Sequence, residues 1–257
     1  MTPSPIGKVL SIFQKHRVRA LLMGGQACIV YGAAEFSRDI DLAVLASPDN
    51  LDRLHSALAE LRAEPVFFPA LSREVLLKGH ACHFRAHVAG AEGFRIDIMS
   101  VLHGCEAFPA LWARRLRLAL PGLGRFPVLA LPDLVRAKKT QRDKDWPMIR
   151  RLIEAAYHRR PARPKREQIQ FWLSEARTPG LLIELCHRYP GNARRIAGKR
   201  PAVGWALKGN QARVEKALRV EEDAARAVDQ AYWKPLREEL NHWRNTRMRK
   251  PRKSNNG

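Results

Sequence analysis

The sequence predicts a mixed α/β domain followed by a basic helical domain. Two observations lead to this fold class. Over roughly the first 130 residues, short apolar runs alternate with amphipathic helical patterns, which is typical of a sheet with flanking helices. After that point only helical patterns follow. With 46% hydrophobic residues among 257, the chain also has enough apolar surface for a buried core, so a disordered chain is excluded.

The elements of the α/β part are predicted from hydrophobic periodicity and turn residues. Ile6, Val9 and Phe13 lie on one face of a predicted first helix. A short strand follows this helix and ends at Gly24. The predicted helices are residues 5–16, 26–31 and 50–62. The predicted strands are residues 19–23, 39–45, 66–68, 81–88, 94–101, 117–120 and 126–129. The fourth and fifth strands form a hairpin across a glycine-containing turn, and so do the sixth and seventh.

The remainder of the chain is predicted to be helical. Pro132 and Asp133 mark the start of a helix over residues 134–158, and Pro147 is the position where that helix would break. Two prolines among basic residues at 160–165 indicate a linker, which further helices follow.

Positive charge is concentrated in the C-terminal part. The chain carries 46 Lys+Arg against 25 Asp+Glu, a formal net charge of +21. Residues 1–157 account for +7 and residues 158–257 for +14. We expect these ranges to be two domains, the second ending in a disordered basic tail from about residue 244. Such charge favours a polyanionic partner, nucleic acid more than membrane, although a protein that is only soluble and basic, or that binds an acidic protein, has the same composition.

The sequence argues against several classes of protein. It contains no apolar run near the roughly 18 residues of a membrane-spanning helix. The N-terminal residues do not resemble a signal peptide. The four cysteines are scattered, which is typical of a reduced, cytoplasmic protein. A zinc site at His80, Cys82, His83 and His87 is not expected, because the paired ligand sets of structural zinc are missing.

Two aspartates occupy alternate positions of the second predicted strand. Asp39 and Asp41 point to one side, while Ile40 and Leu42 face the core. Neighbouring carboxylates repel each other unless a cation lies between them. Mg²⁺ suits them, because it takes one or two carboxylates and completes its shell with water and substrate phosphate. Two solvated acids at a strand end would give the same pattern.

Two further features favour a ligand site near these acids. Gly24 and Gly25 stand between a strand and a helix, where the backbone can approach a phosphate and helix N–H groups are free. An ordinary turn is the alternative there. Asp97 lies between apolar residues of a later strand. If that strand neighbours the strand with Asp39 and Asp41, three carboxylates converge, giving two Mg²⁺ positions, or one Mg²⁺ and a general base.

Together these residues resemble the nucleotidyltransferase superfamily related to DNA polymerase β. The resemblance lies in Gly24-Gly25, thirteen intervening residues, Asp39-Ile-Asp41, and a later apolar-Asp-apolar strand. It implies a nucleotidyltransferase-type mixed sheet with flanking helices, in which the glycine turn contacts a nucleoside triphosphate. It also implies that Asp39, Asp41 and Asp97 are catalytic and hold Mg²⁺, in a two-metal site that Mn²⁺ also fits. Gly25 replaces the serine often found at this turn, which removes a hydroxyl contact to phosphate.

A fourth segment narrows the resemblance. Residues 133–146 are similar to the Lys…Arg-x-x-Asp helix of AbiEii-type nucleotidyltransferases, which are toxins of bacterial type IV toxin–antitoxin systems. On one helix, Lys138, Arg142 and Asp145 would share a face. Lys138 or Lys139, together with Arg142, would bind the phosphates of the nucleotide, and Asp145 would orient them. A solvated, salt-bridged helix is the alternative.

The predicted activity is Mg²⁺-dependent transfer of a nucleoside monophosphate from a nucleoside triphosphate to a hydroxyl group. Arg38, directly before the acids, is a further candidate phosphate contact, although it would equally pair with Asp39. The basic helical part indicates an RNA acceptor, and the resemblance implies tRNA and a cognate antitoxin protein. One alternative is a small-molecule, antibiotic-type transferase, whose cationic substrate would need an acidic pocket. The other is a non-catalytic basic RNA-binding protein on a transferase scaffold.

Overall fold

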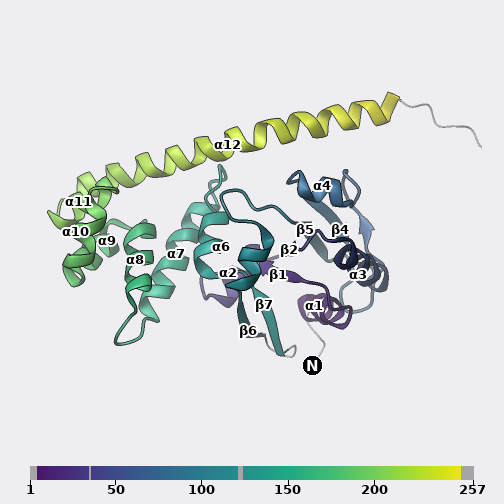
Figure 1. The fold of residues 1–257 in the computed structure, drawn as a ribbon, viewed down its shortest axis with the longest axis horizontal. Coiled ribbons are helices and arrows are strands. Elements are labelled where there is room, and N and C mark those ends of the chain that lie inside the picture. The colour runs from purple at the N-terminus through teal and green to yellow at the C-terminus, as the bar shows by residue number, and fades with distance from the viewer. Residues whose placement is uncertain (1–4, 35, 121–123, 250–257) are drawn as a thin grey trace, which may run out of the picture.

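The computed structural model describes residues 5–34, 36–120 and 124–249, and a mixed sheet forms the centre of their N-terminal part (Figure 1). The strand order is β3-β4-β5-β2-β1-β7-β6. The strands are β1 (Ala20–Met23), β2 (Asp39–Val44), β3 (Glu64–Pro65), β4 (Cys82–Arg85), β5 (Arg95–Met99), β6 (Leu116–Leu120) and β7 (Gly124–Val128). β2 runs parallel to β5 and β1 parallel to β7, and the other neighbours are antiparallel. The predicted mixed α/β fold is therefore confirmed.

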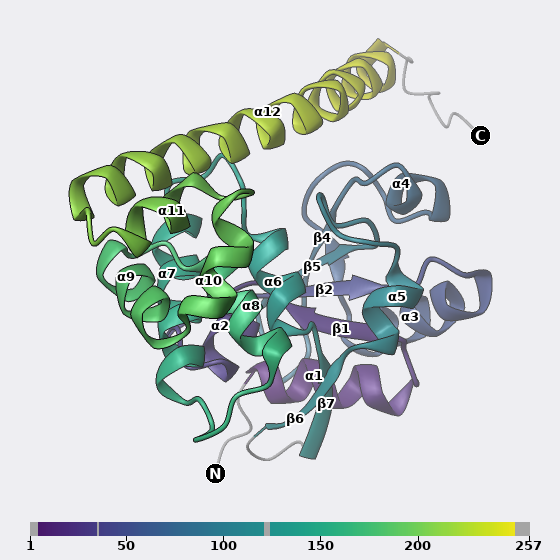
Figure 2. The ribbon, with the colours of Figure 1, turned by 60° about the vertical axis from the view of Figure 1, so that its left-hand side comes forward.

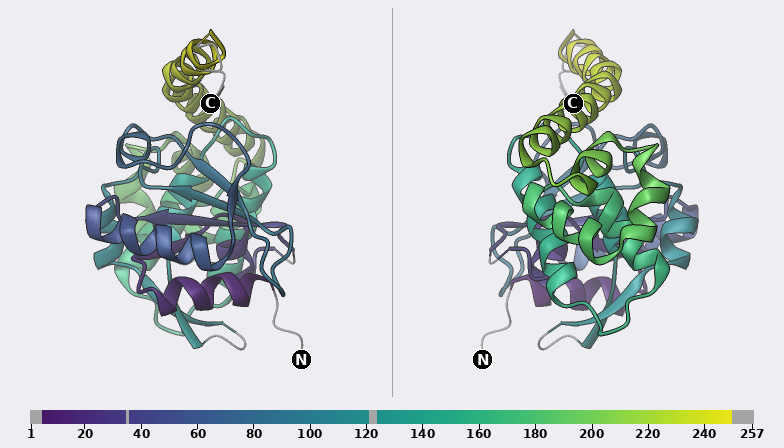
Figure 3. Two further views of the ribbon diagram at one scale, coloured as in Figure 1. Left: turned by 90° about the vertical axis from the view of Figure 1, so that its right-hand side faces the viewer. Right: turned by 90° about the vertical axis from the view of Figure 1, so that its left-hand side faces the viewer.

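Helices flank the sheet. α1 (Pro5–Lys15) and α3 (Pro48–Glu60) lie side by side on one face, and the long helix α12 crosses beyond the opposite face (Figure 1, Figure 3). The amphipathic sequence of α1 explains its position, since Val9, Leu10 and Phe13 are fully buried. Burial of one such side chain contributes about 2 kcal/mol to folding, so these three alone hold α1 on the sheet.

The two sides of β2 differ, as its alternating sequence predicts. Ile40 and Leu42 are fully buried in the core, whereas Asp39 and Asp41 are half-buried. The two acids therefore stand on the other side of the sheet from the apolar side chains of the same strand.

The predicted helix over residues 134–158 is two helices, so this prediction is wrong. α6 spans Leu131–Ala137 and α7 spans Asp145–His158, and residues 138–144 form a loop between them. Polar side chains of the loop hydrogen-bond to the first residue of α7, which replaces the hydrogen bonds of a continuous helix. Pro147 does not break α7, because it lies in the first turn, where its missing N–H has no helical partner to lose.

Smaller differences concern short elements. β3 is Glu64–Pro65 and not residues 66–68, and α2 (Gly24–Val30) begins at the glycine pair itself. Two short helices were not predicted from the sequence, α4 (Arg73–Leu77) and α5 (Phe108–Ala113). Both helices have fewer than two full turns, which is too short for a hydrophobic period to become visible.

The C-terminal part is helical, as predicted. Its helices are α8 (Arg166–Glu175), α9 (Pro179–Arg188), α10 (Pro190–Ala197), α11 (Pro201–Leu207) and α12 (Gln211–Arg249). α9, α10 and α11 each begin with a proline, whose fixed φ suits the first helical position. We call α8 to α11 the helical lobe.

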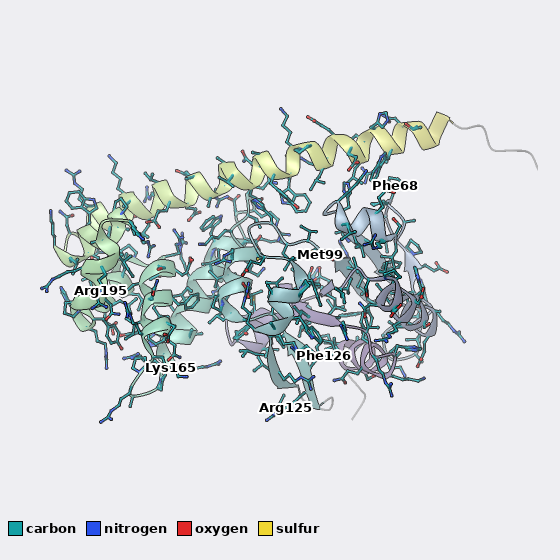
Figure 4. The ribbon with its side chains drawn as sticks, in the orientation of Figure 1. Phe68, Met99, Arg125, Phe126, Lys165 and Arg195 are labelled. Atoms are coloured by element: carbon teal, nitrogen blue, oxygen red, sulfur yellow. The ribbon has the colours of Figure 1, made fainter. Side chains whose placement is uncertain are left out.

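Helix α12 connects the helical lobe with the sheet. Its 39 residues correspond to about 58 Å at 1.5 Å per residue. The first turns pack on α9 and α11, and the helix then runs across the side of the sheet (Figure 2). Near its far end, Glu239 accepts hydrogen bonds from Lys78 Nζ and His80 Nε2, each at 2.7 Å. Trp243 packs edge-on against Phe68, which lies below the same part of α12 in Figure 4.

The prediction of a disordered tail from about residue 244 is wrong for its first six residues. α12 continues to Arg249, so residues 244–249 are helical, and residues 250–257 lie outside the part that the structure describes. No helix among the described residues has both the length and the apolar character needed to span a membrane.

Candidate active site

The pairing of β2 with β5 brings the predicted acids together. In this parallel pair Asp41 is in register with Asp97, and Asp39 is in register with Arg95. Residues paired in this way project to the same face of the sheet. The sequence did not determine whether the strands with Asp41 and Asp97 are neighbours, and the structure shows that they are.

Asp41 packs directly on Gly24. A Cβ atom built on Gly24 would lie 1.8 Å from Asp41 Oδ2, a distance that no real pair of atoms adopts. Gly24 also has a φ of +63°, in the left-handed region that favours glycine. The backbone turn at Gly24 thus needs glycine for two reasons, its conformation and the space that the carboxylate takes. At Gly25, a Cβ would come within 2.5 Å of Ser37 Oγ.

The charge of Asp41 is poorly compensated. Burial raises the pKa of its carboxyl, and the neighbouring charges of Asp39 and Asp97 act in the same direction, so that the pKa is about 6. Lys138 and a backbone hydrogen bond from Gly25 act in the opposite direction without offsetting this increase. A cation placed between these carboxylates would remove the repulsion.

Asp97 already has two partners on neighbouring strand positions. Arg95 Nε donates to Asp97 Oδ1 at 2.8 Å, and His83 Nδ1 lies 2.8 Å from the same oxygen. Burial opposes ionisation of this carboxyl, which is 7% exposed, but His83 and Arg95 together hold its pKa below the usual range. Arg95 and His83 are site residues that the sequence analysis missed. The spacing of Arg95 two residues before Asp97 was the available signal, because such residues share a face of the strand.

Asp39 is held by the segment that precedes β2. Ser37 Oγ donates to Asp39 Oδ1 at 3.0 Å, and the buried Gln26 side chain donates to the backbone oxygen of Asp39 at 3.3 Å. Arg38, the predicted phosphate contact, has an exposed side chain immediately before the strand. Both ends of the glycine turn are therefore connected to the acidic strand.

The predicted basic residues converge, but not on a single helix. Lys138 caps the C-terminus of α6, Arg142 lies in the loop, and Asp145 begins α7. Asp145 joins them, since Lys138 Nζ is 3.1 Å from Oδ1 and Arg142 Nε is 2.8 Å from Oδ2. Thr140 Oγ1 also donates to Oδ2, at 2.6 Å. Burial of Asp145 favours its neutral form, but Lys138, Thr140 and Arg142 hold the pKa below its ordinary value.

The structure distinguishes the two neighbouring lysines. Lys139 turns away and pairs with Glu175 of the helical lobe at 2.7 Å. Lys138 faces the acids. Burial raises the pKa of the Cys28 thiol in α2 to about 11, while Lys138 lowers it and Asp145 and Asp41 raise it. Cys28 thus lies within electrostatic range of both the basic loop and the acidic strand.

The carboxylates of this site are potential ligands of a metal ion. Among the described residues, no three His, Cys, Asp or Glu side chains are arranged as a ready-made ligand group. Mg²⁺ needs only one or two carboxylates besides water and phosphate oxygens. Asp39 and Asp41 provide that pair, and the raised pKa of Asp41 fits an added cation. Arg95 and His83 both contact Oδ1 of Asp97, so Oδ2 is the oxygen through which Asp97 would join.

The histidines of the segment 80–87 contact different acidic side chains. His80 binds Glu239, His83 binds Asp97, and His87 lies 3.2 Å from Glu92. The three rings thus contact three separate carboxylates.

The site therefore combines three carboxylates, a glycine turn and a lysine–arginine loop. Carboxylates of this kind bind hard divalent cations, and lysine and arginine side chains bind phosphate. Lys138 follows Asp41 by 97 residues and Asp97 by 41 residues in the chain, so the sheet and α6 bring the loop and the acids together. Among protein-family models and curated proteins, none matches this chain.

Proposed function

We propose that the chain is a Mg²⁺-dependent nucleotidyltransferase that transfers a nucleoside monophosphate from a nucleoside triphosphate to an RNA hydroxyl. One observation carries the proposal: β2 and β5 pair in the register that sets Asp41 opposite Asp97, with Asp41 packed on Gly24. The residues in this contact are the ones on which the resemblance to the polymerase β-related superfamily depends.

Asp39 and Asp41 would hold the cation. They lie on one face of β2, and the pKa of Asp41 reflects burial and an excess of negative charge. When bound, Mg²⁺ supplies positive charge to the triphosphate oxygens. Asp97 either completes the ligand set or accepts a proton from the attacking hydroxyl, and Oδ2 would serve in either role, because Arg95 and His83 both contact Oδ1.

The basic loop would hold the triphosphate. Lys138 and Arg142 donate to Asp145, and phosphate oxygens are equally good acceptors for both cations. Lys139 has no such role in the proposal, because Glu175 binds it. In the reaction, the acceptor oxygen loses its proton and bonds to the α-phosphorus, and the bond from that phosphorus to pyrophosphate breaks. Positioning and charge neutralisation supply most of the rate enhancement in such a reaction.

An exposed basic surface supports RNA as the acceptor. Residues 158–200 contain 11 Lys and Arg against three Asp and Glu. Eight of these basic side chains are exposed: Arg159, Arg163, Lys165, Arg166, Arg188, Arg194, Arg195 and Lys199. Lys165 and Arg195 lie at the periphery of the helical lobe (Figure 4). Exposed Lys and Arg side chains bind a nucleic-acid backbone through release of counterions. A cationic small-molecule acceptor would be repelled by the same charge.

The resemblance to AbiEii-type enzymes adds a specific acceptor and a biological role to the proposal. On this basis the acceptor is tRNA, and the enzyme acts as a bacterial toxin with a protein antitoxin. The exposed basic side chains support an RNA acceptor, and the toxin role rests on the resemblance alone.

The test is direct labelling of RNA. Purified protein is incubated with Mg²⁺, total bacterial RNA and each α-labelled nucleoside triphosphate in turn, and the products are resolved on a denaturing gel. Asp41→Asn removes the charge at the centre of the site without changing the size of the side chain. Asp52→Asn makes the same change at an exposed position of α3 and is the matched control.

Label in a tRNA-sized band, present with Asp52→Asn and absent with Asp41→Asn, would support the proposal. Triphosphate binding without label in any RNA would refute the RNA acceptor and leave a small-molecule acceptor. A folded protein that binds RNA but no triphosphate would refute transferase activity altogether.

A further inference from the structure

The loop between α6 and α7 is held by helix α12. The backbone N–H of Gln141, at the middle of this loop, donates to Asp229 Oδ2 at 2.8 Å. The backbone oxygen of the same residue accepts a hydrogen bond from Arg226 Nη1, also at 2.8 Å. Two side chains of α12 thus take both polar backbone groups of a single loop residue.

Asp229 and Arg226 are suited to this contact by their positions. Three residues apart on α12, they project from the same face of the helix. Asp229 is 1% exposed, and its other carboxylate oxygen accepts hydrogen bonds from Trp233 Nε1 and His103 Nδ1, each at 3.0 Å. Arg226 also pairs with Asp143 of the loop at 2.8 Å. A buried carboxylate with three donors has a fixed orientation, so Asp229 is a rigid anchor.

The opposite side of the loop rests on Trp146. This side chain is 1% exposed, and its Nε1 donates to the backbone oxygen of Thr140 at 2.9 Å. The Arg226 guanidinium lies 5.5 Å from the centre of the Trp146 ring, within the range of a cation–π contact. The loop is therefore enclosed between α12 and the first turn of α7.

Asp229 also connects the loop with the acidic strands. Its partner His103 lies in the segment after β5, the strand that carries Asp97. The His103 ring stacks on Tyr232 of α12, with ring centres 4.1 Å apart. One carboxylate of α12 thus binds both the basic loop, through Gln141, and the segment that follows β5, through His103.

We propose that Asp229 and Arg226 are positioning residues, which hold residues 138–144 in the conformation that presents Lys138 and Arg142 to the triphosphate. This inference rests on the proposed function for the identity of the ligand. Neither residue touches the nucleotide. Without them the Gln141 peptide group loses its partners, and the loop samples conformations in which the two cations are displaced.

The expected effect is a loss of affinity more than of catalytic rate. Apparent affinity falls in proportion to the fraction of molecules with an ordered loop. Removal of a hydrogen bond to a charged, buried group typically changes such an equilibrium by about tenfold or more. Asp229→Asn should therefore raise the KM for the triphosphate about tenfold, and kcat should stay within about twofold, because the acids are untouched.

Two measurements test the proposal on the full-length chain. Hydrogen exchange monitored by mass spectrometry reports the protection of the amides at 138–144 and needs no nucleotide. Steady-state labelling of RNA gives KM and kcat for the preferred triphosphate. The variants are Asp229→Asn and Arg226→Gln, and their matched controls on α12 are Asp223→Asn and Arg219→Gln. Asp223 is exposed, and Arg219 pairs with Glu215 on the exposed surface.

Faster exchange confined to the loop, with a raised KM in both site variants and neither control, would support the proposal. Unchanged exchange, or an equal loss of kcat, would overturn it. If Asp229→Asn unfolds, Arg226→Gln decides, because the Arg226 side chain is 20% exposed and its substitution leaves the buried Asp229 carboxylate and its partners in place. An unchanged protein that binds no triphosphate refutes the proposed function and the nucleotide role of the loop, while the exchange result still shows whether α12 fixes the loop.

Discussion

Arg95 and Asp97 form an ion pair within a single strand, with Arg95 Nε donating to Asp97 Oδ1 at 2.8 Å. The arginine thereby binds one of the two oxygens of a carboxylate in the proposed site. Its positive charge is also close to all three acids, since Asp97, Asp39 and Asp41 each raise the pKa of Arg95. In this structure Arg95 provides part of the charge that a metal ion would supply.

Removal of this competing charge should strengthen cation binding. We expect Arg95→Gln to raise the affinity for Mn²⁺, used as a spectroscopic substitute for Mg²⁺, by about threefold to tenfold, because a unit charge nearby contributes on the order of 1 kcal/mol at a partly exposed site. Titration followed by electron paramagnetic resonance measures the change. Arg85→Gln, an exposed position on the adjacent strand, is the control. Equal affinities in the three proteins would contradict a metal site at the acids.

Substitution of Gly24 should separate backbone strain from steric overlap. Both Gly24 and Gly93 have positive φ, but a Cβ at Gly93 meets nothing within 4 Å. We expect Gly93→Ala to cost about 1 kcal/mol, from conformational strain alone. Gly24→Ala should cost at least about 1 kcal/mol more, because the methyl group displaces the Asp41 carboxylate. Urea unfolding measures both variants, and equal losses would mean that Asp41 does not pack on this turn.

Stability should depend on pH through Asp145. The folded pKa of this buried carboxyl is lower than its unfolded value, since Lys138, Thr140 and Arg142 outweigh the effect of burial. Its contribution is therefore complete above the unfolded pKa of about 4 and is lost as the pH falls through the lower folded pKa. At pH 7, Asp145→Asn should cost about 2–3 kcal/mol, because two cations lose their partner.

The measurement is urea unfolding of this variant and of the unchanged protein at several pH values. The difference between the two should shrink as the pH falls from 5 towards 3. Asp52→Asn, at an exposed position, should show no such difference at any pH. A constant penalty for Asp145→Asn across the whole range would show that the ion pairs add nothing to stability.

RNA affinity should depend on salt through the basic tail. Removal of residues 244–257 deletes six Lys and Arg. If all six contact phosphate, the slope of log K against log salt becomes less negative by about 4. The double variant Lys165→Gln/Arg166→Gln, on the helical lobe, should change the slope by about 1.4. An unchanged slope in the truncated protein would show that the tail is not an electrostatic anchor.

Local patterns predict much of this site, and long-range contacts account for what they miss. The alternation of Asp39 and Asp41 with apolar neighbours was sufficient to place the acids on one side of a strand. The glycine turn was expected near these acids, but the packing of Asp41 on Gly24 was not predicted. Helical spacing correctly grouped Lys138 with Asp145, yet the mechanism differs, because a loop and two ion pairs join these residues.

The break between α6 and α7 was outside the reach of any local pattern. The hydrogen bond that fixes the loop joins Gln141 to Asp229, 88 residues later in the chain. His83 was missed for a related reason, since it reaches Asp97 only through the pairing of β4 with β5. Periodicity describes how one element is buried, and it contains no information about which distant side chain completes a loop.

The position of Asp229 has a consequence for synthesis of the protein. A chain growing on the ribosome exposes the sheet, the acids and the basic loop well before α12 emerges, because domains fold as their residues leave the ribosome. Until the anchor for Gln141 arrives, the nascent chain holds the loop of residues 138–144 without its final hydrogen bonds. The loop is therefore completed only after α12 has emerged, and a chain that terminates before α12 would retain the three aspartates without an ordered loop to accompany them.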